Sequence, residues 1–192
     1  MTQQIFSATV LLKAMTRSNL SIVREWRNTP ATRKKMFTTH EIKSDEHITW
    51  FERIQQDSTK LFYLVSIENN DVGIVSFTNI NQKNACAEWG FYKNPNTRKG
   101  IGLVILHATL NHAFDSLRLK QINSRVLAIN PKVLHLHNKL GFTRIDAKTI
   151  FHNQQKKMIS YFNLVVTNDV WLSHEAGVRK QLRIFSQQSM AL

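Results

Sequence analysis

The chain has 192 residues, of which 42% are hydrophobic and 20% are charged, a balance ordinary for one globular domain. Its 26 lysine and arginine residues outnumber 13 acidic residues, so the formal net charge of +13 favours anionic partners. A single cysteine, Cys86, excludes an intrachain disulfide framework, and with no leader-like start and no membrane-length apolar stretch we expect a cytoplasmic protein without a membrane partner.

Hydrophobic periodicity and turn residues divide the chain into strands and helices. In chain order we predict a strand at 8–13, a helix from about Asn19 to Asn28, a helix after Ser44, strands at 61–67, 72–80 and 85–92, a helix at 101–117, a strand at 121–129, a short helix between Asn130 and Gly141, a strand at 157–166 and a helical tail from 169 to about 187. No linker divides the chain, so we expect one domain at 1–166 with a helical extension of it at 167–192.

The predicted helix at 101–117 is apolar nearly all round, which indicates burial against a sheet. A strand–helix–strand crossover joins parallel neighbours, so the strands at 85–92 and 121–129 should run parallel. Short polar turns join the three strands between 61 and 92, which makes them antiparallel. We therefore predict an α/β fold (an α+β mixed sheet) with a mostly antiparallel sheet, one parallel pair and helices on both faces.

A glycine turn opens this apolar helix. Gly100 and Gly102 directly follow Arg98 and Lys99. The first amides of a helix have no partner of their own, and the helix dipole favours negative charge at that end. Glycines also allow close approach of a ligand to the backbone. The turn therefore predicts a site for an anionic group.

The element order, the turn Gly100-Ile101-Gly102 and the block at 130–142 together resemble the GNAT superfamily of acyl-CoA-dependent N-acetyltransferases. The block begins with Asn-Pro and ends in Lys-Leu-Gly-Phe, and the resemblance covers about residues 8–166. It implies a GNAT fold in which the parallel fourth and fifth strands splay apart. It also implies acetyl-CoA as co-substrate and no metal.

Three segments of the front half resemble, more narrowly, the nucleotide-sugar N-acetyltransferases of the pseudaminic acid pathway: Glu25-Trp-Arg-Asn28, Arg33-Lys-Lys-Met36 and Glu46-His-Ile-Thr-Trp-Phe51. Those enzymes acetylate the 4-amino group of UDP-4-amino-4,6-dideoxy-N-acetyl-β-L-altrosamine, a precursor of the sugar placed on bacterial flagellins. Ribosomal-protein N-terminal acetyltransferases share the Trp-Arg-Asn theme. A protein N-terminus therefore stays open as the alternative acceptor.

The resemblance implies a set of cofactor-binding residues. The backbone amides of the turn would wrap the pyrophosphate, with two side chains adding charge, and a strand and an asparagine would hold the pantetheine arm. The residues in these roles are Arg98, Lys99, Gly100, Ile101, Gly102 and Leu103 at the turn, with Phe91, Tyr92 and Asn130 along the arm. Thr97 stands where the family prefers arginine or glutamine. Asn130 has a second interpretation as a plain helix N-cap.

Direct attack by an amine on the thioester requires one proton to leave the ammonium and one to reach the thiolate. The family places a tyrosine acid where this chain has His137, so the resemblance assigns the acid to that histidine. Glu88 is the candidate base on the strand beside the thioester. For His137 the alternative is a histidine on a helix face beside His135, and for Glu88 it is a surface or ion-paired strand glutamate.

The first two predicted helices and their connection correspond to the acceptor site of the family. The candidate substrate-binding residues there are Arg27, Asn28, Met36, His47 and Trp50, and Ser76 and Asn79 on a central strand are candidates to hold a water or orient the sugar. Arg27 or the group at 33–35 would meet the UDP diphosphate. The competing interpretation places the aromatic residues, including Trp26, in the core.

The sequence thus favours an enzyme that acetylates an amino nucleotide sugar, a small-molecule partner. A basic module that binds nucleic acid is the alternative from another class, and the scattering of its basic residues in short groups argues against it. Two roles stay open for the tail at 167–192: covering the substrate side, or forming the contact of a homodimer.

Overall fold

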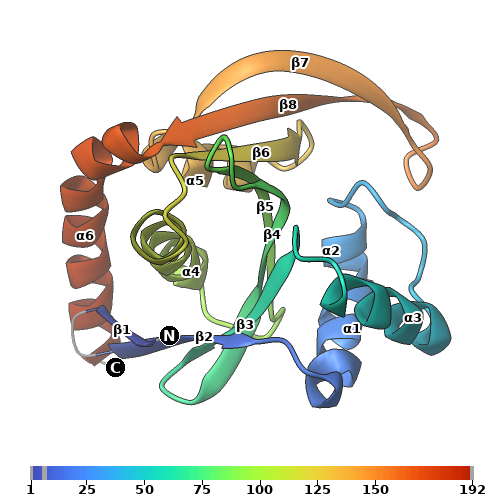
Figure 1. Ribbon diagram of the computed structural model, residues 1–192, viewed down its shortest axis with the longest axis horizontal. Coiled ribbons are helices and arrows are strands. Elements are labelled where there is room, and N and C mark those ends of the chain that lie inside the picture. Colours follow the sequence, from blue (N-terminus) through green and yellow to red (C-terminus); the bar gives the residue numbers. More distant parts are fainter. Residues whose placement is uncertain (1, 6–7, 191–192) are drawn as a thin grey trace.

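The computed structural model describes residues 2–5 and 8–190, and the side chains from 9 to 183. Within these residues one eight-stranded sheet has the order β1-β2-β3-β4-β5-β6-β8-β7 (Figure 1). The strands are β1 (Thr2–Ile5), β2 (Ala8–Ala14), β3 (Leu61–Ile67), β4 (Asn70–Asn81), β5 (Cys86–Lys93), β6 (Gln121–Leu127), β7 (Thr143–His152) and β8 (Lys157–Thr167). Among them β5 and β6 pair in parallel and the other neighbours are antiparallel, which confirms the predicted mixed sheet.

Helices cover both faces of the sheet, as predicted (Figure 1). They are α1 (Leu20–Asn28), α2 (Pro30–Arg33), α3 (Ser44–Gln55), α4 (Ile101–Asn111), α5 (Pro131–Lys139) and α6 (Asn168–Met190), with a 3-10 turn at Arg17–Asn19 and a π-helical turn at His112–Ser116. The first three lie on one face, and α4, α5 and α6 lie on the other. None of the described helices is both long and apolar enough to cross a bilayer.

Each face has its own hydrophobic core. The larger core surrounds α4, where Ile105 and Leu106 are fully buried, as the all-round apolar pattern predicts. The smaller core lies under α1 and α3 and includes Trp26 and Phe51, each 3% exposed. The core interpretation of Trp26 is therefore correct.

The parallel pair is short, and this creates the opening in the sheet. β5 and β6 pair from Cys86 opposite Gln121 as far as Trp89 opposite Ser124. Beyond that point β5 continues along β4 to Lys93, while β6 continues along β8. The two strands therefore diverge, and this is the splay of parallel strands that the family resemblance implies. We call the opening the β5–β6 gap.

The structure contains two strands, β1 and β7, that were not predicted. It also shows that the predicted helix at 101–117 is α-helical only to Asn111. β7 is a sheet edge, and most of its side chains are exposed, including Ile145 at 63% and Phe151 at 55%. The alternation of buried and exposed residues that identifies a strand is therefore missing there.

The C-terminal helix α6 packs against α4. The Trp171 indole is 1% exposed and donates to the Asn111 amide oxygen over 2.9 Å. Nε2 of His107 in α4 lies 2.8 Å from Oε1 of Glu175 in α6. This tail therefore covers the α4 side of the sheet, opposite α1–α3 (Figure 1).

Candidate active site

A cavity of about 980 Å³ runs along the β5–β6 gap and is lined from both faces of the sheet. On the α1–α3 face its wall includes Arg27, Met36 and Phe37. On the other face it includes Leu103 of α4 and Leu136 of α5. We call this space the central cavity, its α1–α3 face the acceptor side and its α4–α5 face the cofactor side. Two reactants could enter it from opposite faces and meet at the gap.

The glycine turn forms one end of the cofactor side. Gly100 precedes α4 with a φ of 89°, which favours glycine. A Cβ on Gly102 would lie 3.5 Å from Leu136 Cδ1, an ordinary contact, so the protein itself leaves room there. The Leu103 amide already bonds to the Gly100 carbonyl over 3.0 Å. The earlier amides of the turn are thus the ones available to an anion, and Leu103 contributes its side chain instead.

Lys93 and Thr97 brace this turn. Lys93 Nζ donates to Thr97 Oγ1 over 2.8 Å, and the Thr97 hydroxyl donates to the Asn94 carbonyl over 2.7 Å. Burial lowers the pKa of Lys93, whose side chain also lines the central cavity. The threonine that departs from the family pattern therefore closes the loop. Sequence reasoning missed Lys93.

Asn130 carries an unsatisfied buried atom. It is the N-cap residue of α5, as predicted, and its carbonyl accepts from the Val133 amide over 3.1 Å, but its side chain makes no capping bond. Its Oδ1 is buried and finds no hydrogen-bond partner among the described residues. Because it lines the central cavity, this oxygen is available to an N–H group of a ligand.

Phe91 and Tyr92 point to opposite faces of β5, as neighbours in a strand do. Phe91 packs with the core around α4, on the cofactor side. Tyr92 packs with the core under α1 and α3, where burial raises its pKa and Arg27 partly offsets that rise. Both line the central cavity, but the structure places Tyr92 on the acceptor side rather than along the predicted pantetheine arm.

His137 is 1% exposed and both of its ring nitrogens have partners. The Trp89 indole N–H donates to Nε2 over 3.2 Å, so Nε2 carries no proton. Nδ1 therefore holds the proton and donates it to the Val133 carbonyl over 2.9 Å. Burial lowers the pKa of His137 to about 4. A neutral ring with its single proton turned to the backbone is a poor acid, which corrects the role expected for this residue.

Glu88 is ion-paired at the edge of the central cavity. Arg125 Nε donates to Glu88 Oε1 over 2.7 Å, and Asn79 donates to Oε2 over 3.4 Å. The same guanidinium lies over the ring of Phe37, 5.2 Å from its centre. Arg125 and Asn79 therefore fix the position of the carboxylate where it borders the cavity.

Arg27 is the most buried cation on the acceptor side. It is 9% exposed, and its Nη2 donates to the Thr38 carbonyl over 2.7 Å. Its Nη1 is buried without a partner in the described part of the chain, and burial lowers the pKa of the guanidinium. A buried charge with an open N–H favours an anionic ligand.

Asn28 and the two α3 residues have structural roles instead. The Asn28 side chain bonds both the carbonyl and the amide of Ile42, over 2.8 and 2.9 Å. His47 is 4% exposed and its ring stacks on Trp50 at 5.0 Å. None of these three predicted substrate residues lines the central cavity.

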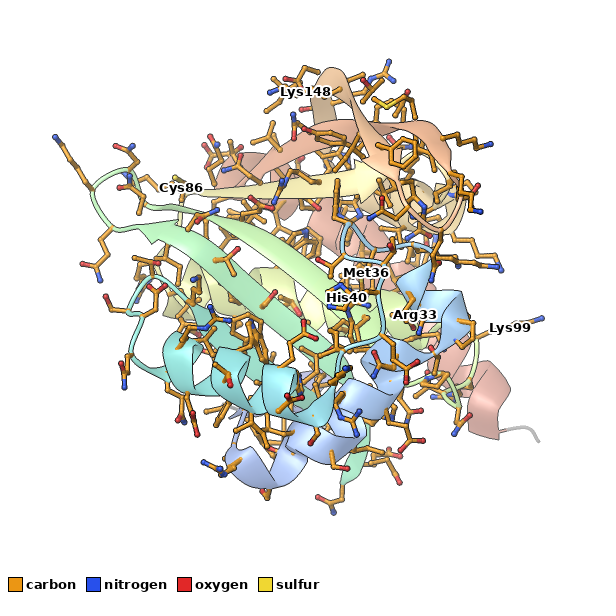
Figure 2. The ribbon with its side chains drawn as sticks, turned by 90° about the vertical axis from the view of Figure 1, so that its right-hand side faces the viewer. Arg33, Met36, His40, Cys86, Lys99 and Lys148 are labelled. Carbon is orange, nitrogen blue, oxygen red and sulfur yellow. The ribbon has the colours of Figure 1, made fainter. Side chains whose placement is uncertain are left out.

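The loop after α2 and the β7–β8 hairpin meet over the acceptor side (Figure 1). Gln154 at the hairpin donates to the Thr39 carbonyl over 3.0 Å, and the rings of Phe37 and Tyr161 meet edge to face at 5.3 Å. Figure 2 shows Arg33, Met36 and His40 gathered by this loop, and Cys86 at the distant end of its strand. Segments far apart in sequence therefore build this side.

The structure brings most of the predicted residues together at the central cavity. Those that line it are Arg27, Met36, Ser76, Glu88, Phe91, Tyr92, Lys99, Gly100, Gly102, Leu103, Asn130 and His137. Those outside its lining are Asn28, His47, Trp50, Asn79, Arg98 and Ile101. The Ile101 side chain belongs to the core, which leaves its backbone amide for a ligand. Lys35, from the predicted basic group at 33–35, also lines it, and lining residues that sequence reasoning missed include Phe37, Lys93, Ser124 and Arg125.

Comparisons with known proteins agree with this geometry. Residues 9–143 match the acetyltransferase (GNAT) domain family. The chain is 30% identical over 147 residues to the acetyltransferase PseH of Campylobacter jejuni, covering 75% of this chain and 91% of that protein.

Solved structures show the same fold. The spermidine N-acetyltransferase of Vibrio cholerae, in complex with CoA and spermine, has a TM-score of 0.77 at 21% identity, over 85% of this chain and 98% of that one. Campylobacter jejuni PseH in complex with acetyl coenzyme A has a TM-score of 0.64 at 23% identity, over 83% of this chain and 99% of that one.

Proposed function

The chain belongs to the GNAT acetyltransferase family, and on that basis we propose that it transfers the acetyl group of acetyl-CoA to the 4-amino group of a UDP-linked amino-dideoxy sugar, a step of pseudaminic acid biosynthesis. The similarity to PseH of Campylobacter jejuni supports the pathway. The chemistry of the central cavity supports the class of acceptor.

Acetyl-CoA fits the cofactor side. Its pyrophosphate would meet the amides of 100–102, with Lys99 beside them, where a glycine leaves room at 102. The unsatisfied Oδ1 of Asn130 suits an amide N–H of the pantetheine arm. When bound, the co-substrate supplies an acetyl thioester.

The observation that carries the choice of acceptor is the buried Arg27 with its open Nη1. A diphosphate would satisfy this N–H and neutralise the charge, with Lys35 of the same wall as a second cation. Met36 and Phe37 add apolar surface beside these cations for the nucleoside or sugar.

The charge of the central cavity distinguishes an anionic from a cationic acceptor. Among its described lining residues, the cations are Arg27, Lys35, Lys93, Lys99, Arg125, Lys132 and Lys139. Glu88 is the single acidic side chain in that lining, and Arg125 already pairs with it. A polyamine would meet repulsion here, whereas a nucleotide sugar would meet attraction.

The residues of this chain divide the work of direct amine attack. Glu88 would take the proton of the acceptor ammonium, through a water molecule, because it is the acidic side chain that borders the cavity. Beyond Trp89, β5 has no β6 partner, so a backbone N–H there can donate to the carbonyl oxygen as negative charge develops on it.

A panel of acceptors tests the proposal. Release of CoA thiol from acetyl-CoA is measured with a UDP-4-amino-4,6-dideoxy sugar, spermidine and a peptide with an open N-terminus. We expect the UDP sugar to give the highest kcat/KM and spermidine the lowest. A peptide that outperforms the UDP sugar would replace the proposal with a protein N-terminal acetyltransferase.

A further inference from the structure

Ser124 occupies the point where β5 and β6 separate. It is opposite Trp89 in the last parallel pair, it is 4% exposed, and it lines the central cavity. Its Oγ lies 2.9 Å from Nε2 of His137. We propose that the Ser124 hydroxyl delivers the proton to the leaving CoA thiolate and that His137 is its positioning residue. This inference rests on acetyl transfer from acetyl-CoA but not on the identity of the acceptor.

The hydrogen-bond pattern leaves the Ser124 hydroxyl able to turn. Nε2 of His137 has one lone pair, and two donors face it: the Trp89 indole N–H at 3.2 Å and the Ser124 hydroxyl. If the hydroxyl rotates toward the cavity, the indole still satisfies Nε2. No buried atom loses its partner, so the rotation avoids the usual penalty of an unmade hydrogen bond.

Other hydroxyl groups of the cavity are less suited. Ser76 and Tyr92 lie on the acceptor side, where Ser76 Oγ approaches the Gly90 carbonyl at 3.4 Å. Burial raises the pKa of Tyr92, which disfavours loss of its proton. Ser124 instead faces His137 on the cofactor side, beside the gap through which the two sides connect.

The proton transfers balance. Once the amine nitrogen has bonded to the acetyl carbon, that carbon carries both the positively charged nitrogen and the departing sulfur. As the carbon–sulfur bond breaks, its electron pair goes to sulfur, which takes the Ser124 hydroxyl proton. The Ser124 oxygen takes a proton from the nitrogen in exchange. The products are a neutral amide and a thiol, and the serine is regenerated.

Kinetics of Ser124→Ala and Ser124→Thr test this role. We expect Ser124→Ala to lower kcat by about 10²-fold with the KM for acetyl-CoA within about twofold, and Ser124→Thr, which keeps a hydroxyl, to recover most of the loss. Ser160→Ala, an exposed β8 serine, is the matched control. An alanine variant with the parent's kcat, or a threonine variant as slow as alanine, would overturn the proposal.

A binding measurement gives a readout that does not need turnover. The pKa of the bound CoA thiol is followed by the ultraviolet absorbance of its thiolate. A hydroxyl that donates to the thiolate lowers this pKa, so it should be lower in the parent and in Ser124→Thr than in Ser124→Ala. Equal values in all three would contradict the proposal. A parent that binds no CoA would instead remove the proposed function, and this inference with it.

Discussion

The cofactor side of the central cavity comes largely from one stretch of chain, residues 89–103, together with α5, whereas the acceptor side comes from segments far apart in sequence. Contacts such as Arg27 with Thr38 and Gln154 with Thr39 join those segments. The cofactor side offers backbone amides, one asparagine oxygen and the nearby Lys99. The acceptor side offers the buried Arg27 with Lys35 beside it.

This difference predicts which substrate each substitution affects. Backbone amides at a helix start depend on local geometry, so a substitution there should change the affinity for acetyl-CoA alone. The acceptor side depends on long-range contacts that position the loop at 34–43. Substitutions in that network should affect the acceptor, with little effect on acetyl-CoA.

The largest expected effect concerns acid stability of the cofactor side. The native pKa of His137, about 4, lies below its ordinary value of 6.5, so the unfolded chain binds a proton that the native chain does not. This contribution to stability is fully present above about pH 6.5 and is lost as the pH falls toward 4, by about 3 kcal/mol. Denaturant unfolding of the parent and His137→Leu across this range measures it, and equal pH slopes would contradict the burial of a neutral ring.

The next largest effect should come from a carboxylate at the glycine turn. Gly102→Asp places negative charge where we place the pyrophosphate, so acetyl-CoA binding should weaken by about 10²-fold. Titration calorimetry measures this, with Gly177→Ala as control because a Cβ at 177 meets nothing within 4 Å. An unchanged affinity for acetyl-CoA would show that the pyrophosphate does not bind at the glycine turn.

On the acceptor side, Arg27→Ala should raise the KM for the UDP sugar about 10- to 100-fold, since a charged hydrogen bond to the diphosphate is lost. The dissociation constant of acetyl-CoA should stay the same. Arg24→Ala is the matched control, because Arg24 lies on the same helix and bonds the Ile42 carbonyl but does not line the cavity. An equal rise in both variants would show that only loop position matters.

Asn28 supports the loop at 34–43 and does not line the cavity, so its substitution should affect the acceptor side indirectly. Asn28→Ala removes two bonds to Ile42, so we expect the melting temperature to fall by several degrees and the KM for the UDP sugar to rise up to about tenfold. Acetyl-CoA affinity should not change. A variant that loses acetyl-CoA affinity to the same degree would break the separation of the two sides.

The smallest effect is expected at Asn130. Asn130→Ala should weaken acetyl-CoA binding about fivefold, because one neutral hydrogen bond is lost. The melting temperature of the protein without ligand should not fall, because the Oδ1 that is removed has no partner in the described structure. A clear drop in melting temperature would assign Asn130 to the fold instead of the ligand.

Sequence reasoning succeeded where the structure is local. The glycine turn, the parallel pair and the buried helix all follow from patterns within a few turns of chain. Asn28 was misassigned because its partner, the backbone of Ile42, approaches only after the loop folds back. Ser124 and Arg125 were missed because a plain strand pattern does not reveal that β6 leaves β5 at that point.

Initial-rate kinetics with acetyl-CoA and the UDP amino sugar test the central claim most directly. If both substrates occupy the central cavity together from opposite faces, double-reciprocal lines at different fixed acceptor concentrations must intersect. Parallel lines, with an acetylated enzyme isolated in the absence of acceptor, would show that the two substrates act in turn and would contradict direct transfer across the gap.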